Sequence, residues 1–180
     1  CTADYTASTG GHSRWSAVNW ARRYPDMRAN DAKGLTYTTA TLSADREVTG
    51  HPVVYLWFAT DAADLDVFVY LEDVDPSGKS TYVTEAVLRA THRKTGAAPF
   101  NNLNLPFHLH YKSDLAPITA GEPFEMTFSL LPTSYKFRQG HRIRITVAFA
   151  DADNFETSII APAPRVRLLS DKAHPSFVEM

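Results

Sequence analysis

A basic stretch is the first place where this sequence suggests chemistry. Residues 135–146, "YKFRQGHRIRIT", hold three arginines, one lysine and one histidine. Such a density could form a groove for an anionic ligand or a set of catalytic groups. However, Ile143 and Ile145 alternate with Arg142 and Arg144, and successive side chains of a strand point to opposite faces. The pattern therefore favours the polar half of one strand, or a surface that faces another domain.

Serine hydrolysis is the second chemistry to consider. A serine nucleophile needs a base and an oxyanion hole, and these are often built around a G-x-S-x-G motif. That motif is absent, and "GGHS" (10–13) is the only segment that resembles a catalytic histidine site. Because His12 follows two glycines, a turn explains it better. We predict no catalytic residue in this chain.

Two segments resemble metal sites. His108 and His110 would share one face of an extended segment, but further zinc ligands would have to come from elsewhere. "DVDPSG" (73–78) matches the start of an EF-hand loop, yet Thr84 stands where the last glutamate belongs. The residues 75–78, "DPSG", instead fit a type I turn that joins two strands. We predict no metal and no cofactor.

An acidic loop and a tryptophan pair raise the possibility of ligand binding. Asp151 and Asp153 follow a strand, where carboxylates could bind calcium or sugar hydroxyls, although capping of backbone amides is the commoner use. Trp15 and Trp20 could stack on a sugar, or pack against the domain or a missing partner. Trp57 lies in the most apolar segment, and we expect it in the core.

The elements that must position these residues are mostly strands. Strand-like alternation or β-rich composition covers residues 35–42, 53–60, 66–74, 80–93, 123–131, 141–150 and 164–170. Short strands separated by Pro, Gly and Asp turns predict an all-β sandwich or jelly roll. One helix is expected over residues 16–24, ended by Pro25, and residues 95–118 are expected to form a long loop.

Bulk composition limits the classes of function. A length of 180 residues suits one domain, and a net charge of −2 does not favour nucleic acid or an anionic membrane as a partner. A single cysteine, Cys1, excludes a disulfide framework, and no apolar run approaches the roughly 18 residues of a membrane span. A chain that starts on Cys suggests a fragment. We expect a soluble protein, either cytoplasmic or secreted.

Three groups of motifs resemble one family. Residues 34–94 and 120–151 are similar to the C-terminal domain of the CocE/NonD family of α/β-hydrolases, which includes cocaine esterase and X-Pro dipeptidyl-peptidase. The second range holds Gly-Glu-Pro, Pro-Thr and Gly-His-Arg in the family's order. "STGGHSRWS" (8–16) matches the family's opening segment, with Arg14-Trp15 in the expected place. The resemblance covers nearly the whole chain.

This resemblance implies a galactose-binding-like jelly roll that follows a serine hydrolase domain in the same polypeptide. The family's catalytic triad lies in that upstream domain, so no catalytic residue is carried over to this chain. The family's C-terminal domain stabilises the catalytic domain and helps to wall the substrate cleft. We therefore expect residues 1–180 to form one jelly-roll domain without its catalytic domain, with 1–34 as an N-terminal strap and interdomain segment.

The leading prediction is an accessory domain of an esterase or X-Pro dipeptidyl-peptidase. The candidate ligand or interdomain contacts are Arg14, Trp15, Trp20, Asp151 and Asp153. The alternative is a jelly-roll module that binds carbohydrate or another small ligand. A free-standing hydrolase is the third possibility, and the missing nucleophile motif argues against it. An apolar face left bare by the missing domain would let the fragment self-associate.

Overall fold

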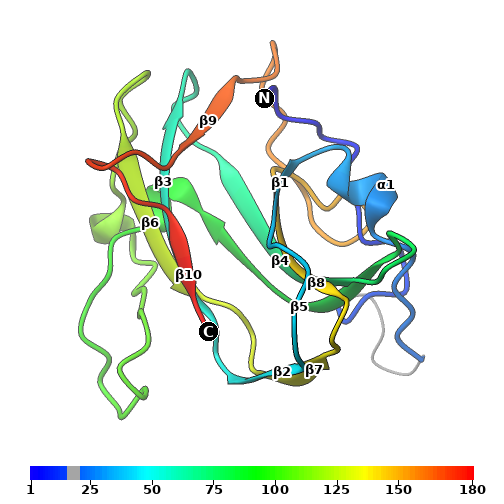
Figure 1. Cartoon of the computed structure of the whole chain (residues 1–180). Helices are drawn as coiled ribbons and strands as arrows, with labels where there is room; N and C mark the ends of the chain where they lie inside the picture. Colours follow the sequence, from blue (N-terminus) through cyan, green and yellow to red (C-terminus); the bar gives the residue numbers. More distant parts are fainter. Residues whose placement is uncertain (16–20) are drawn as a thin grey trace.

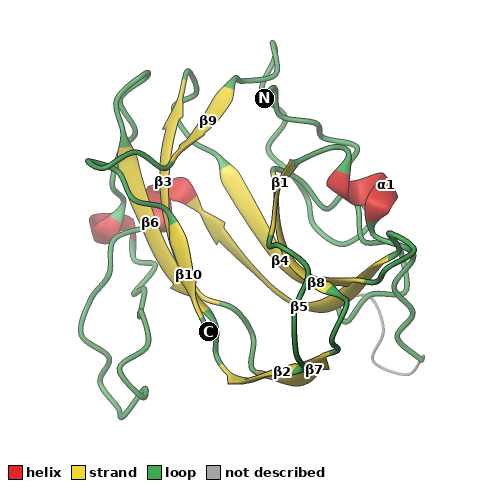
Figure 2. Ribbon diagram, in the orientation of Figure 1, coloured by secondary structure: helices red, strands yellow, loops and turns green. Residues whose placement is uncertain are grey.

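Strands dominate the computed structural model, which describes residues 1–15 and 21–180 (Figure 2). The strands of this described part are β1 (Leu35–Thr38), β2 (Arg46–Gly50), β3 (Val53–Thr60), β4 (Asp66–Val74), β5 (Ser80–Arg89), β6 (Phe124–Ser129), β7 (Thr133–Phe137), β8 (Arg142–Ala148), β9 (Val166–Leu169) and β10 (Phe177–Glu179). Helical turns are short: α1 (Arg28–Asp31) and two 3-10 turns, Ala90–His92 and Lys112–Asp114. In the described residues, no helix is long and apolar enough to cross a membrane.

The strands form two facing sheets and one ribbon, with antiparallel pairing throughout (Figure 1). One sheet has the order β1-β8-β4-β5. The other has the order β10-β3-β6, and β9 pairs with the second half of β3. The ribbon β2-β7 lies at one end of the two sheets. The all-β sandwich is thus confirmed, while the jelly-roll designation stays a prediction.

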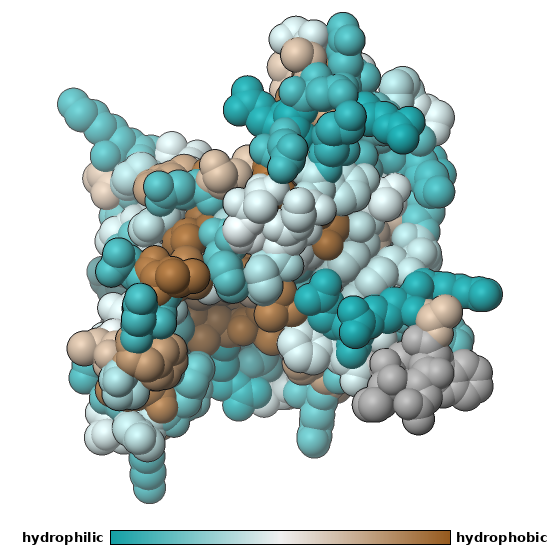
Figure 3. All heavy atoms as spheres, turned by 90° about the horizontal axis from the view of Figure 1, so that it is seen from below, coloured by the Kyte–Doolittle hydropathy of each residue, from teal (hydrophilic) through white to brown (hydrophobic). Residues whose placement is uncertain are grey.

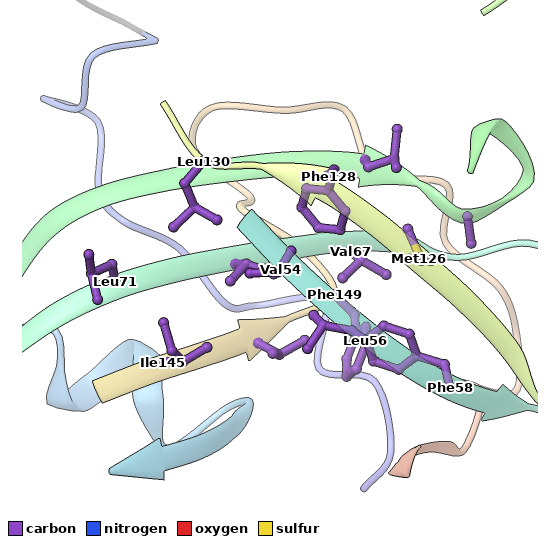
Figure 4. Close-up of a cluster of buried hydrophobic side chains, with 14 of the residues drawn as sticks. Val54, Leu56, Phe58, Val67, Leu71, Met126, Phe128, Leu130, Ile145 and Phe149 are labelled. Atoms are coloured by element: carbon purple, nitrogen blue, oxygen red, sulfur yellow. The ribbon is translucent and has the colours of Figure 1, made fainter. Parts of the chain in front are cut away.

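The core lies between the two sheets, where the alternating positions predicted from the sequence meet. Side chains from β3, β4, β6 and β8 point toward one another in this layer (Figure 4). The predicted inward residues Phe124, Met126, Phe128, Leu130, Ile143, Ile145, Val147 and Phe149 are all buried. Each large side chain buried in this way contributes about 1.5–3 kcal/mol of transfer free energy, so the layer is the main source of stability.

The hairpin between β4 and β5 confirms the turn predicted at residues 75–78. The Gly78 amide donates to the Asp75 carbonyl over 2.9 Å, and Gly78 has a φ of +87°, which favours glycine at this position. The two strands also shift register between Leu71 and Glu72, which marks a bulge or irregularity in their pairing. The EF-hand interpretation has no support.

The structure differs from the predicted helix and from the predicted position of Trp57, and it contains one strand that was not predicted. Residues 21–24 are not helical, and residues 16–20 of the expected helix lie outside the described residues. Instead, the short helix α1 begins after Pro25. Trp57 is half-buried on the outer side of β3, where its ring meets His174 edge to face, so it is not a core residue. The strand β2, which pairs with β7, was not expected at all.

The described residues 1–15 and 21–34, called here the N-terminal segment, include the stretch that covers the outer face of the β1-β8-β4-β5 sheet (blue in Figure 1). A second apolar cluster forms beneath it and joins Ala7 and Met27 to Phe68, Tyr70 and Ala148. The alternation predicted for 66–74 explains this arrangement, since Phe68 and Tyr70 point away from the main core. The outer face of this sheet is therefore buried as well.

Candidate functional site

The candidate residues gather where the N-terminal segment meets the loop 151–156. Asp151 is fully buried, and its carboxylate accepts hydrogen bonds from the Thr9 amide over 3.0 Å and the Thr9 hydroxyl over 2.6 Å. The Asn154 side-chain amide donates to the same carboxylate over 2.8 Å. With three protein donors in place, Asp151 joins the loop to the N-terminal segment.

Asp153 is exposed and has a simpler role in the same contact. Its carboxylate accepts a hydrogen bond of 2.5 Å from the Ser8 hydroxyl. Asp151 and Asp153 therefore accept hydrogen bonds from residues 9 and 8, respectively. Through these bonds the loop holds the N-terminal segment on the sheet. This is the amide-capping and hydroxyl-binding use of loop carboxylates.

Trp15 and Arg14 meet at Glu85, a buried residue of β5 that sequence reasoning missed. The Trp15 indole Nε1 donates to Glu85 Oε1 over 3.0 Å, and Tyr82 donates its hydroxyl to the same oxygen over 2.8 Å. The Arg14 Nε lies 3.6 Å from that oxygen. Burial raises the pKa of Glu85, while the Tyr82 hydrogen bond and the Arg14 charge act in the opposite direction.

Aromatic rings surround this carboxylate. Tyr24 stacks on Tyr82 with ring centroids 3.6 Å apart, and Trp15 meets Phe155 edge to face at 5.1 Å. The Arg14 guanidinium lies 5.7 Å from the centroid of the Tyr82 ring. Trp15 remains 44% exposed, so one part of its ring is anchored and another part reaches the surface. The other tryptophan candidate, Trp20, lies outside the described residues.

Two buried carboxyl groups, those of Asp31 and Glu72, anchor α1 to the sheet. The Thr146 hydroxyl lies 3.0 Å from Glu72 Oε2 and 3.3 Å from Asp31 Oδ1, so the two carboxyl groups meet at one donor. Arg144 binds Asp31 through an Nη1–Oδ2 contact of 2.7 Å. Burial raises the pKa of Glu72 to about 8, and the charge of Asp31 adds to the shift.

Arg144 of the basic stretch and four of the seven histidines contact oxygen acceptors within the domain. Arg144 is paired with Asp31, as described above, and His141 Nδ1 lies 2.8 Å from an oxygen of Asp73. The ring bonds found for four histidines lead only to carbonyl or carboxylate oxygens: His51, His108, His141 and His174. None of these four rings is thus paired with a serine or cysteine, the arrangement that activates a nucleophile.

The His108 and His110 pair is also poorly suited to zinc. Their ring centroids are 5.8 Å apart, and both nitrogens of His108 face backbone carbonyls, those of Lys94 and Thr127. Across residues 1–15 and 21–180, no group of three or more His, Cys, Asp or Glu side chains is arranged to hold a metal ion. The His108 ring is instead held by backbone carbonyls of the domain.

Comparison with known proteins gives the family. Residues 2–173 match the family described as the X-Pro dipeptidyl-peptidase C-terminal non-catalytic domain. The chain belongs to this family.

Relatives of this C-terminal domain family are named as esterases. The chain is 45% identical over 184 residues to a Mycobacterium bovis protein named "Putative serine esterase", covering 98% of the chain and 29% of that protein. It is 29% identical over 122 residues to the cocaine esterase of a Rhodococcus strain, covering 68% of the chain and 18% of that protein. The chain thus spans less than a third of the length of these relatives.

Solved structures share the fold of the domain. An α-amino acid ester hydrolase superposes with a TM-score of 0.69 at 22% identity, covering 85% of the chain and 26% of that structure. A CocE/NonD family hydrolase from Staphylococcus aureus gives a TM-score of 0.67 at 17% identity, covering 83% of the chain and 31% of that structure. At such identities the likeness concerns the fold alone.

In this member of the C-terminal domain family, four of the five candidate residues lie together and the fifth is not described. Arg14, Trp15, Asp151 and Asp153 all join the N-terminal segment to the sheet or to the loop 151–156. The buried carboxylates Glu72 and Glu85 were missed. A signal was present for Glu85, which stands between Thr84 and Ala86 inside a strand, whereas Glu72 is followed by Asp73 and gave no such signal. Their partners could not be read from the sequence.

Proposed function

We propose that this chain is the accessory C-terminal domain of a serine hydrolase of the acyl esterase or X-Pro dipeptidyl-peptidase type. The observation that carries the proposal is the match of 98% of the chain, at 45% identity, to a protein that bears an esterase name and is more than three times as long. The family itself is described as non-catalytic, so the hydrolytic groups belong to the remaining polypeptide.

In this proposal the domain stabilises the catalytic domain and forms part of the wall of its substrate cleft. The N-terminal segment supports a mechanical role, because it is fixed to the sheet by buried acceptors at Asp151, Glu85 and Asp31. A segment anchored in this way would hold the preceding domain in a constant orientation. Each such bond to a buried carboxylate is worth roughly 1.5–3 kcal/mol.

The carbohydrate-binding alternative has less support. The two carboxylates on which it depended are bound by Thr9 and Ser8, and the Trp15 indole is bonded to Glu85. A sugar would have to displace these contacts to reach the same oxygens. We therefore retain the accessory-domain proposal.

Three measurements test the proposal. The gene upstream of the codon for Cys1 should encode an α/β-hydrolase with a G-x-S-x-G motif, and an unrelated upstream sequence would refute it. The 180-residue chain should not turn over an activated ester or an X-Pro chromogenic peptide, whereas the parent protein should act on one of them. Removal of residues 1–180 from the parent should lower its melting temperature and raise KM more than it lowers kcat.

A further inference from the structure

An apolar groove of about 360 Å³ lies between the two sheets, with β1 and β8 on one side and β9 and β10 on the other. None of its lining side chains is charged. Leu56, Ile145 and Leu168 lie among the inner lining residues, and Tyr37, the cross-strand partner of Ile145, stands at the rim. Tyr37 is 45% exposed, a high value for a large side chain that faces an apolar hollow. The other aromatic lining residue, Phe177, stacks on Tyr55 and so points to the outer side of β3. In Figure 3, apolar residues gather in one patch surrounded by hydrophilic ones.

The groove also lies between unpaired strand edges. In the described part of the chain β1 pairs only with β8 and β10 only with β3, so each of these two strands leaves one backbone edge open, while the outer edge of β9 is bonded to Cys1 at Val166 and continues beyond it. Open edges next to an apolar surface favour association with another polypeptide, and proteins usually cover them. Hydroxyls of Ser170 and Ser176 border the groove without adding charge. The surface thus suits an uncharged, apolar occupant.

The position of Cys1 indicates where such an occupant comes from. The Cys1 amino group donates to the Val166 carbonyl over 2.9 Å, and the Val166 amide donates back over 2.8 Å, at the start of β9. Leu168, which lines the groove, is two residues further along the same strand, roughly 7 Å away at 3.3 Å per residue. A polypeptide that precedes Cys1 would therefore arrive beside the groove.

We propose that an apolar ridge of the polypeptide that precedes Cys1 in the parent protein docks in this groove, between β1 and β10. This inference rests on the proposed function, since it requires a domain upstream. The mycobacterial relative has enough additional sequence for such a domain, because the chain accounts for only 29% of that protein. The neighbouring hollow at Cys1, of about 620 Å³, is a weaker candidate for an apolar ridge because it is lined by Asp61, Arg165 and Arg167.

Site-specific photocrosslinking in the parent protein tests the groove directly. The photoreactive residue p-benzoylphenylalanine would replace Tyr37 at the rim, and in matched controls it would replace Ile159 or Tyr111, which are 75% and 64% exposed on loops that do not line the groove. Peptide mapping after irradiation should find the Tyr37 probe joined to sequence upstream of Cys1 within one polypeptide. The two control probes should give no such product.

Other products would overturn the inference. A Tyr37 crosslink between two polypeptides of equal mass would make a second copy the occupant, and the absence of any crosslink at a fully incorporated probe would mean that nothing covers the groove. Upstream crosslinks from Ile159 or Tyr111 but not from Tyr37 would place the interface elsewhere. All three results are compatible with an upstream hydrolase, so they refute the groove and not the accessory role.

A charge in the groove gives an independent measurement. Tyr37→Glu in the parent protein should lower its melting temperature, because a carboxylate would have to enter an uncharged interface. Ile159→Glu, the matched control at an exposed apolar residue outside the groove, should leave the melting temperature unchanged. Equal melting temperatures for the two variants would contradict the proposed docking.

Discussion

The indole of Trp15 donates a hydrogen bond of 3.0 Å to Glu85, a residue that is 70 positions away and buried in β5. Tyr82 donates to the same oxygen, so two donors from different parts of the chain meet one carboxylate. This contact fixes the N-terminal segment to the outer face of the β1-β8-β4-β5 sheet. It explains how a tryptophan that is 44% exposed can still be held in one position.

Trp15→Phe should lower the free energy of unfolding by about 1–2 kcal/mol, because a buried carboxylate loses a donor while most of the ring packing is kept. Urea denaturation of Trp15→Phe, Glu85→Gln and the double variant would measure the coupling between the two side chains. We expect non-additive effects. Strict additivity would mean that the hydrogen bond does not contribute to stability. Glu122→Gln, at an exposed residue outside the cluster, is the control.

Asp151→Asn should cost about 1–3 kcal/mol, since the new amide group would face donors from Thr9 and Asn154 inside a buried site. Asp153→Asn is the matched control two residues away: its carboxylate is exposed and has one hydroxyl partner, so we expect about 0.5 kcal/mol or less. Chemical denaturation of both variants provides the comparison. Similar losses of stability for the two variants would show that the burial of Asp151 does not determine the effect.

The stability of the chain should fall as the pH rises, because of Glu72. Its pKa is raised from 4.5 to about 8 in the folded state, chiefly by burial and then by the charge of Asp31. The folded state therefore binds a proton that the unfolded state releases. This contribution is fully present below pH 4.5 and is lost as the pH rises through about 8. A shift of this size corresponds to on the order of 4 kcal/mol across that window.

Unfolding free energies measured at intervals between pH 5 and pH 9 would check this dependence on the wild type and on Glu72→Gln. The glutamine variant keeps an acceptor for Ser80 and Thr146 but has no proton to lose. We expect its profile to be flatter over this range. Equal slopes for the two proteins would show that Glu72 does not bind the extra proton.

The strands that could be predicted from the sequence are those with one clearly buried face. In β6 and β8 the inward apolar residues repeat every second position, so the inner face follows directly from the pattern. Trp57 was misplaced because β3 is apolar on both sides, and a continuous apolar run does not say which face is inner. The segments β2, β10 and α1 have only three to five residues, too few for a period to be detected.

The candidate site could be predicted only in part, for a related reason. Loop position and residue type indicated Asp151 and Trp15, but the partners that define their role are 142 and 70 positions away. Such pairs arise from the sheet order, in which β4 lies between β5 and β8. A single sequence carries no signal for that order, so Glu72 and Glu85 could not be connected to the N-terminal segment.

The two arginines of the basic stretch should differ in their effect on stability. Arg144 is largely buried and binds Asp31 over 2.7 Å and the Thr38 hydroxyl over 2.9 Å. Arg144→Gln leaves a buried carboxylate without its positive partner, so we expect a loss of about 2–4 kcal/mol. Arg142→Gln, on the same face two residues earlier, should change stability by about 0.5 kcal/mol or less. Urea denaturation of both variants at pH 7 distinguishes an ion pair that anchors α1 from a merely polar strand face, on which the two substitutions would have equal and small effects.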